Sequence, residues 1–376
     1  MTAGESKPAE WFLQRMPEPA LMRELLRGDP VSRLLGVARE RAIVNGGVVP
    51  QPRPGADDAA VRAALELAIS AAKAISQQGP AVELSTEQQA ALELFVLLVS
   101  RPSLFVRGGR IIDDPENWPE IRRDEALLPE NIASVGRIEM AGGRKVGTGF
   151  LAGKQRILTN NHVVCGLLGE APDFWLEQPD AYAARCEATA TSWQPGAGSS
   201  PRFEQFGEVE SNATAVVSIQ RVVGHHAVFD LAVLELERDP VGARPLRLAS
   251  AAPANFDSLR LYAVGYPVDD ARTIWGKRVT PAHVFERIFG MDVATLGTKR
   301  FSPGTVLGWE DAVFLHDAST LQGSSGSCLI DFESRRVVGV HFRGSYGDRK
   351  NFAVPLFKLE DDPTLASSGV VFAGEG

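Results

Sequence analysis

The stretch from Gly147 to Val164, GTGFLAGKQRILTNNHVV, decides the class of fold. It is rich in Leu, Ile, Val and Phe, and glycine or polar residues interrupt it every few positions. Short apolar segments bounded in this way are typical of β-strands joined by turns. The pattern therefore predicts β-strands here, the last of them running through His162 to Val164.

Similar segments continue along the second half of the chain and are separated by Gly and Pro. They are RIEM, DLAVLELE, LRLYAVGYP and RRVVGVHF. Each is short and rich in residues that favour strands. We therefore expect residues 131–376 to form one all-β domain.

The first hundred residues have a different pattern. Apolar residues recur three and four apart in 11–27 and 31–43, and 57–76 is rich in alanine, so these three segments are expected to be helices. A further helix is expected after Ser85, because Ser85 and Gln88 have the spacing of a capping box.

These patterns divide the chain into three parts. Residues 1–100 are expected to form a small helical domain, and 101–130 a connector to the β domain that begins at 131. Within the helical part, the proline-rich stretch 46–55 is expected to be a linker. The helical domain carries no motif for chemistry, so we expect it to bind a protein partner or to self-associate.

Composition and charge exclude several classes of protein. The 376 residues carry a formal net charge of −8, which disfavours nucleic-acid and membrane-surface partners. The longest apolar run, Leu94–Val99, is far shorter than the about 20 residues that cross a bilayer. The first residues lack the apolar core of a secretory signal, so a cytoplasmic location is expected.

The three cysteines, Cys165, Cys186 and Cys328, have no paired spacing, which fits a reducing compartment. No cysteine and histidine spacing resembles a zinc site. We therefore expect neither a metal nor a cofactor.

The candidate nucleophile is Ser325, in Gly323-Ser324-Ser325-Gly326-Ser327. Small residues on both sides allow a sharp turn that exposes the hydroxyl. The main-chain N–H groups of Gly323 and Ser325 could then converge as an oxyanion hole. Taken alone, the same sequence also describes a flexible loop.

The candidate base is His162, which ends an apolar segment, and the candidate orienting acid is Asp230, which begins the segment DLAVL. A carboxylate among apolar residues is costly unless it is paired, and the imidazole of His162 would pair it. Taken singly, His162 could be a structural histidine and Asp230 an acidic residue at a strand end.

The three candidates occur in the order His162, Asp230, Ser325, which differs from the order in subtilisin and in α/β-hydrolases. Here the chain resembles the trypsin-like serine peptidases. LTNNHVV, DLAVL and GSSGS are similar to the histidine, aspartate and serine motifs of that family, and the resemblance extends over 134–355. Two departures are Ser324, where the family has Asn or Asp, and Cys328 after the serine motif.

The resemblance implies a chymotrypsin-like fold of two six-stranded antiparallel β-barrels, preceded here by the small α-helical domain. It also implies a serine endopeptidase that cuts protein or peptide substrates through a catalytic triad and an acyl-enzyme. His162, Asp230 and Ser325 would be the triad, and the main chain of Gly323 and Ser325 would bind the oxyanion.

Two further residues resemble those of the bacterial glutamyl endopeptidase branch. Thr320, five residues before Ser325, and His341, in the strand that would lie along the substrate, match the residues that hold an acidic side chain there. Thr320 and His341 are therefore candidate substrate-binding residues, and a Glu or Asp before the cut is the expected preference. A small or apolar side chain is the rival preference. Asp317 lies two positions too early for the residue that selects Lys or Arg in trypsins.

The same branch suggests a processing cut between Arg110 and Ile111, although Arg110 is also explained as a loop charge. Two other functions stay open. The chain could be a catalytically silent trypsin fold that acts as an adaptor through its helical domain. It could also be a cysteine peptidase that uses Cys165 or Cys328, although neither occupies the nucleophile position of GSSGS.

Overall fold

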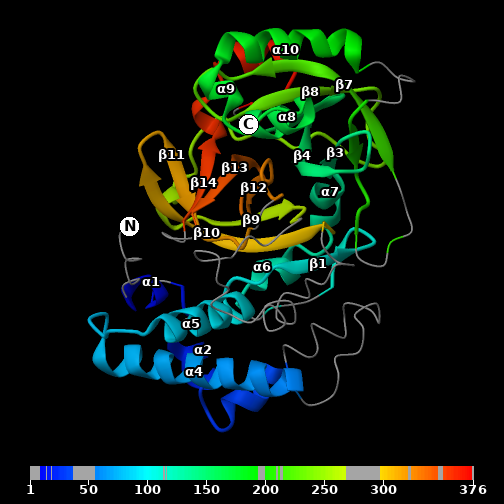
Figure 1. The fold of residues 1–376 in the computed structure, drawn as a ribbon. Helices are drawn as coiled ribbons and strands as arrows, with labels where there is room; N and C mark the ends of the chain where they lie inside the picture. Colours follow the sequence, from blue (N-terminus) through cyan, green and yellow to red (C-terminus); the bar gives the residue numbers. More distant parts are fainter. Residues whose placement is uncertain are drawn as a thin grey trace.

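The computed structural model places helices at one end of the molecule and β-structure above them (Figure 1). It describes residues 9–13, 15–17, 19–36, 56–112, 115, 117–193, 200–208, 211, 215–267, 297–320, 323–345 and 350–374. The predicted linker at 46–55 and the end of the predicted helix at 31–43 lie outside these residues.

The N-terminal part contains α1 (Ala9–Leu13), α2 (Pro19–Leu25), α4 (Ala56–Gln78) and α5 (Thr86–Val99), with a further helical stretch at 30–36. The single helix predicted at 11–27 is wrong, since α1 and α2 are separate. Pro17 explains the break, because a proline inside a helix lacks the N–H that the helix requires, whereas Pro19 occupies the first position of α2, where no such N–H is needed.

The start of α5 confirms the predicted capping box. The N–H of Gln88 donates to Oγ of Ser85 at 3.2 Å, and the N–H of Ser85 donates to Oε1 of Gln88 at 2.9 Å. Buried side chains of Leu65 in α4 and Phe95 in α5 belong to a hydrophobic cluster of the helices' own. The helical part therefore has its own core.

The stretch predicted as a connector is folded. It forms β1 (Leu104–Arg107), β2 (Arg110–Ile111), α6 (Pro119–Arg123) and α7 (Leu128–Ala133). β2 pairs with β1 across Gly108 and Gly109, which both take positive φ. The candidate processing bond between Arg110 and Ile111 therefore lies in a β-hairpin.

The first barrel consists of six antiparallel strands in the closed order β3-β4-β5-β8-β7-β6. The strands are β3 (Val135–Glu139), β4 (Lys145–Gly153), β5 (Arg156–Thr159), β6 (Arg202–Glu204), β7 (Val216–His225) and β8 (Ala232–Leu236). Between β5 and β6 the chain forms α8 (Asn161–Leu168), α9 (Phe174–Glu177) and α10 (Pro179–Ser192). α10 lies beside β7 at the end of the molecule opposite the N-terminal helices (Figure 1).

The second barrel is also a ring of six antiparallel strands, in the order β11-β14-β13-β12-β9-β10, and the β10–β11 pairing closes it. The strands are β9 (Arg260–Gly265), β10 (Arg300–Glu310), β11 (Val313–His316), β12 (Cys328–Asp331), β13 (Val337–Ser345) and β14 (Lys350–Pro355). The short helices η1 (Phe256–Ser258), η2 (Leu356–Lys358) and α12 (Pro363–Ser368) flank it. The predicted double-barrel fold with N-terminal helices is confirmed.

Two features join these parts. β1 extends the sheet of the second barrel by pairing with the start of β10, with Leu104 opposite Phe301. A single hydrophobic cluster includes Phe150 and Val233 from the first barrel and Tyr262 and Phe301 from the second. Among the described residues, no helix is both long and apolar enough to span a bilayer.

Candidate active site

His162 lies in the first turn of α8, not at the end of a strand. The predicted strand through Val164 is therefore wrong, and β5 ends at Thr159. Asn160 keeps an extended backbone (φ −100°, ψ 155°) and serves as the N-cap from which the helix starts. The helical turn places Val163 and Val164 in the core and leaves His162 partly exposed.

Asp230 lies in the β7–β8 connection and contacts His162 twice. Its Oδ2 lies 2.6 Å from Nδ1 of the imidazole, and its Oδ1 accepts the main-chain N–H of His162 at 3.0 Å. An ionised carboxylate only accepts hydrogen bonds, so Nδ1 carries the proton and Nε2 of the neutral ring is left as a proton acceptor. The structure thus brings together the predicted base and orienting acid.

Two asparagines that precede His162 in the LTNNHVV motif hold this pair in place. Nδ2 of Asn160 donates to the carbonyl of Asp230 at 2.7 Å. Nδ2 of Asn161 donates to the carbonyls of His226 and Phe229 at 3.0 and 3.2 Å. The sequence alone assigns neither asparagine a role. The pattern that could have indicated this role is the pair of amide side chains directly before the candidate base.

Ser325 lies on the connection between β11 and β12. It is partly exposed, whereas its neighbours from Gly323 to Ser327 are buried. The main-chain carbonyl of His341 in β13 accepts the N–H of Gly326 at 2.8 Å. The N–H of His341 donates to the carbonyl of Ser327 at 2.9 Å. These bonds therefore fix the part of the loop that directly follows Ser325.

The hydroxyl of Ser325 lies 3.5 Å from the carbonyl oxygen of Phe342. Within the described part of the chain, no hydrogen bond joins Ser325 to His162. Likewise, the main-chain N–H groups of Gly323 and Ser325 donate no hydrogen bond to any described residue.

Thr148 of β4 fixes the Ser325 loop from the opposite barrel. Its N–H donates to the carbonyl of Ser325 and its Oγ1 to the carbonyl of Gly323, each at 2.8 Å. The same Oγ1 accepts the N–H of Tyr266 at 3.0 Å. Thr148 belongs to the Gly-Thr-Gly run at the start of the stretch that decides the fold. This threonine connects the two barrels at the candidate nucleophile.

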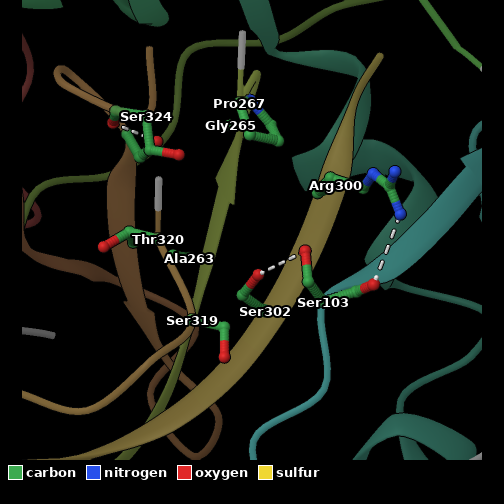
Figure 2. A pocket seen from close by; sticks show the side chains of 10 residues that line it. Ser103, Ala263, Gly265, Pro267, Arg300, Ser302, Ser319, Thr320 and Ser324 are labelled. Carbon is green, nitrogen blue, oxygen red and sulfur yellow. Dashed lines mark hydrogen bonds between the residues drawn. The ribbon is translucent and has the colours of Figure 1, made fainter. Parts of the chain in front are cut away.

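Thr320 lines a pocket beside this loop (Figure 2). Six hydroxyl side chains contribute to the lining, from Ser103, Ser302, Ser319, Thr320, Ser324 and Ser327. Arg300 also lines it, with Nη1 3.5 Å from the carbonyl oxygen of Ser103. His341 is not among the lining residues, so the structure does not unite Thr320 and His341 in this pocket.

His341 is only 3% exposed, and its Nδ1 lies 3.1 Å from Nε2 of His316 in β11. Burial lowers the pKa of His316 to about 3. Burial, followed by the nearby His316 and His162, holds the pKa of His341 well below its ordinary value. Both buried rings are therefore neutral at neutral pH, and one donates to the other. His316 could not be identified from the sequence, because nothing in the surrounding VFLH indicates that His341 is its partner.

The cysteines do not form an alternative nucleophile. Cys165 and Cys328 are fully buried, and burial raises their pKa values to about 11 and about 12. They therefore stay protonated at neutral pH, whereas a nucleophilic cysteine needs the thiolate. The described residues contain no group of three or more His, Cys, Asp or Glu side chains arranged to hold a metal ion.

Comparisons with known proteins agree with the motifs. Residues 147–340, more than half of the chain, match the family model of the trypsin-like peptidase domain. A comparison with curated proteins gave no match.

Three solved structures of proteases illustrate the similarity. The Rv3671c protease of M. tuberculosis, in its inactive form, is 19% identical with a TM-score of 0.37, covering 68% of this chain and 94% of that chain. Neuropsin from mouse brain is 11% identical with a TM-score of 0.40, covering 62% and 93%. Deg5 is 19% identical with a TM-score of 0.41, covering 67% and 98%.

Proposed function

Because the chain belongs to the trypsin-like peptidase domain family, we propose that it is a serine endopeptidase with Ser325, His162 and Asp230 as its catalytic triad. The observation that carries this proposal is the 2.6 Å contact between Nδ1 of His162 and Oδ2 of Asp230. This contact gives the imidazole the tautomer and the orientation that a general base for a serine hydroxyl requires.

The proposed reaction begins when Nε2 of His162 takes the proton of Ser325 and Oγ attacks the carbonyl carbon of the scissile bond. The N–H groups of Gly323 and Ser325 would stabilise the negative oxygen that forms. The imidazolium then gives its proton to the leaving amine, which departs and leaves an acyl-enzyme. Water, deprotonated by His162, hydrolyses that ester and restores Ser325.

The hydroxyl of Ser325 has to turn away from the carbonyl of Phe342 for this step. A rotation about one side-chain bond is a small change, and catalytic hydrogen bonds commonly tighten only when substrate binds. The hydrogen bonds that fix the loop main chain and the contact between His162 and Asp230 support the rest of the proposal.

A fluorophosphonate probe tests the proposal directly, because it reacts with an activated serine and leaves ordinary hydroxyls unmodified. The full chain should be labelled, and mass spectrometry should locate the adduct at Ser325. Ser325→Ala should abolish both labelling and peptide hydrolysis, while Ser334→Ala, on the turn between β12 and β13, should leave both unchanged. An adduct elsewhere, or full hydrolysis by Ser325→Ala, would refute the role of Ser325.

For the substrate, we propose a Glu or Asp side chain before the cut. Thr320 supports this proposal, because its hydroxyl lines the pocket beside the Ser325 loop and can donate a hydrogen bond to a carboxylate. His341 could contribute its imidazole only if substrate binding exposes this buried ring. A fluorogenic peptide panel that varies only this position tests the preference. Fast cleavage after Leu or Arg, with little after Glu, would exclude it in favour of an apolar or basic preference.

One observation favours a second candidate function, that of a catalytically silent adaptor that binds a protein partner through its helices. Ser325 has no hydrogen bond to His162 in the described part of the chain, and its hydroxyl faces Phe342 instead. Absence of fluorophosphonate labelling in the folded full-length chain would support the adaptor over the peptidase.

A further inference from the structure

Asp317 is a buried carboxylate next to the candidate specificity residue, and it is fully engaged by the protein. Its Oδ1 accepts the N–H of Thr305 at 2.7 Å, and its Oδ2 accepts the hydroxyl of the same residue at 3.1 Å. Its side chain is 2% exposed. Asp317 therefore has no free oxygen to offer to a basic substrate side chain.

Two guanidinium groups from outside the barrels neutralise Asp317. Nε of Arg101 lies 2.8 Å from Oδ1, and Nε of Arg15 lies 4.0 Å from Oδ2, with both arginine side chains largely buried. Burial raises the pKa of Asp317, but Arg101 and Arg15 more than offset it, so the net pKa is lowered. Arg15 follows α1, and Arg101 follows the C-cap of α5. Both ion-pair partners of the carboxylate are therefore attached directly to N-terminal helices.

Asp317, Arg15 and Arg101 form a charged cluster, which is anchored at the C-terminal end of α5. Nη1 of Arg101 donates to the carbonyl of Ser100 at 2.9 Å, and Nε1 of Trp118 donates to the same carbonyl at 2.8 Å. Nδ2 of Asn117 donates to the carbonyl of Val99 at 2.7 Å. These bonds satisfy helix-end carbonyls that have no partner inside the helix. The end of α5 is thereby fixed to the segment that leads into α6.

The two residues that follow Asp317 are also held by hydrogen bonds. The carbonyl of Ala318 accepts Nδ2 of Asn351 at 2.8 Å, and the hydroxyl of Ser319 donates to the carbonyl of Arg101. Thr320 comes next and lines the pocket of Figure 2 together with Ser319. The N-terminal part therefore holds one end of the segment that leads to the candidate nucleophile.

We propose that Asp317 is a positioning residue through which Arg15 and Arg101 couple the docked N-terminal helices to the Ser325 loop. The helices are then a required part of the catalytic unit. This inference rests on the proposed peptidase function, because it needs a competent loop to position. Loss of either arginine weakens the compensation of the buried carboxylate, which is relieved when Asp317 takes up a proton or when the segment that carries it moves.

The test compares Arg15→Met, Arg15→Lys and Arg101→Met in the full chain. We measure the rate of fluorophosphonate labelling at Ser325, kcat and KM on one peptide, and the thermal unfolding midpoint. Arg15→Met and Arg101→Met should lower the labelling rate and kcat about ten- to a hundredfold at temperatures where the protein stays folded. Arg15→Lys keeps the charge and should recover most of the labelling rate.

A matched control is Arg244→Met, which removes an exposed ion pair with Glu130 (3.1 Å) and should change nothing measurable. If Arg15→Met does not fold, Arg15→Gln, which removes the charge but stays polar, is compared with Arg244→Gln for hydrogen exchange of residues 316–320 and for labelling. Faster exchange together with slower labelling supports the coupling, and unchanged values overturn it.

The outcomes separate this inference from the proposed function. A wild-type chain that is labelled, with Arg15→Met labelled equally fast, overturns the coupling and leaves the peptidase intact. Faster labelling of Arg15→Met also overturns it, because the helices would then restrain the site. A wild-type chain that is not labelled removes the peptidase proposal and the coupling with it.

Discussion

Asp230 accepts two hydrogen bonds from His162, one from Nδ1 of the ring at 2.6 Å and one from the main-chain N–H at 3.0 Å. The two contacts fix both the position and the rotation of the imidazole. Orientation of a base by a carboxylate is what proton transfer from a serine requires.

Asp230→Asn should therefore lower kcat/KM by a factor on the order of 10⁴, because an amide in place of the carboxylate favours the wrong imidazole tautomer. The variant should still fold, since an amide oxygen can accept the main-chain N–H of His162. Steady-state hydrolysis beside circular dichroism checks both statements. Activity within tenfold of wild type would contradict the orienting role of Asp230.

Thr148→Val should weaken the connection between the barrels. The change keeps the shape of the side chain but leaves the buried carbonyl of Gly323 and the N–H of Tyr266 without their partner. An unsatisfied buried group costs about 1–3 kcal/mol, so the two together should lower the free energy of unfolding by about 2–6 kcal/mol. Labelling of Ser325 should slow by about tenfold as the loop loosens.

Urea unfolding and fluorophosphonate labelling measure the two effects of Thr148→Val. Thr191→Val is the control, because Thr191 is exposed on α10 and its hydroxyl bonds only its own helix. Equal behaviour of the two variants would show that Thr148 does not hold the loop.

Gly326→Ala should be poorly tolerated. Gly326 has φ +89°, and a Cβ there would lie 1.9 Å from the carbonyl oxygen of Thr148 and 2.7 Å from Oγ1 of Thr159. Backbone strain and overpacking together should cost at least about 3 kcal/mol and abolish labelling. Thermal unfolding checks the cost. Gly142→Ala, where a Cβ meets nothing within 4 Å, should stay at the wild-type midpoint.

The buried histidines should make the protein sensitive to acid. His316 has a pKa of about 3 in the folded state against 6.5 in the unfolded chain, so the unfolded state alone binds a proton between these values. Stability should therefore fall as the pH drops below about 6.5, by about 1.4 kcal/mol per pH unit for this group.

His316→Gln cannot take up the proton. The variant should therefore lose the part of the pH dependence of stability that His316 causes. Urea unfolding of both proteins at several values between about pH 6 and pH 4 measures it. Parallel slopes for wild type and His316→Gln would show that His316 does not cause the acid sensitivity.

Local sequence patterns predicted those elements whose conformation depends on residues that are close together in the sequence. Ser85 and Gln88 form the capping box that their spacing indicates, since both partners lie within one helical turn. By contrast, the apolar spacing of 11–27 favours one helix, but Pro17 lies between α1 and α2, and Pro19 begins α2. The spacing reports which face is apolar, whereas the absence of an N–H decides where the helix stops.

The sequence by itself determined the family, the double-barrel fold and the identity of the candidate residues His162, Asp230 and Ser325, because residue type and order along the chain are properties of the sequence. Only the tertiary structure decided what supports them. Thr148 bonds a loop 175 residues away, and Asp317 is neutralised by Arg101 from a separate part of the chain. Such contacts depend on how the barrels close and where the helices dock, and no local pattern encodes that geometry.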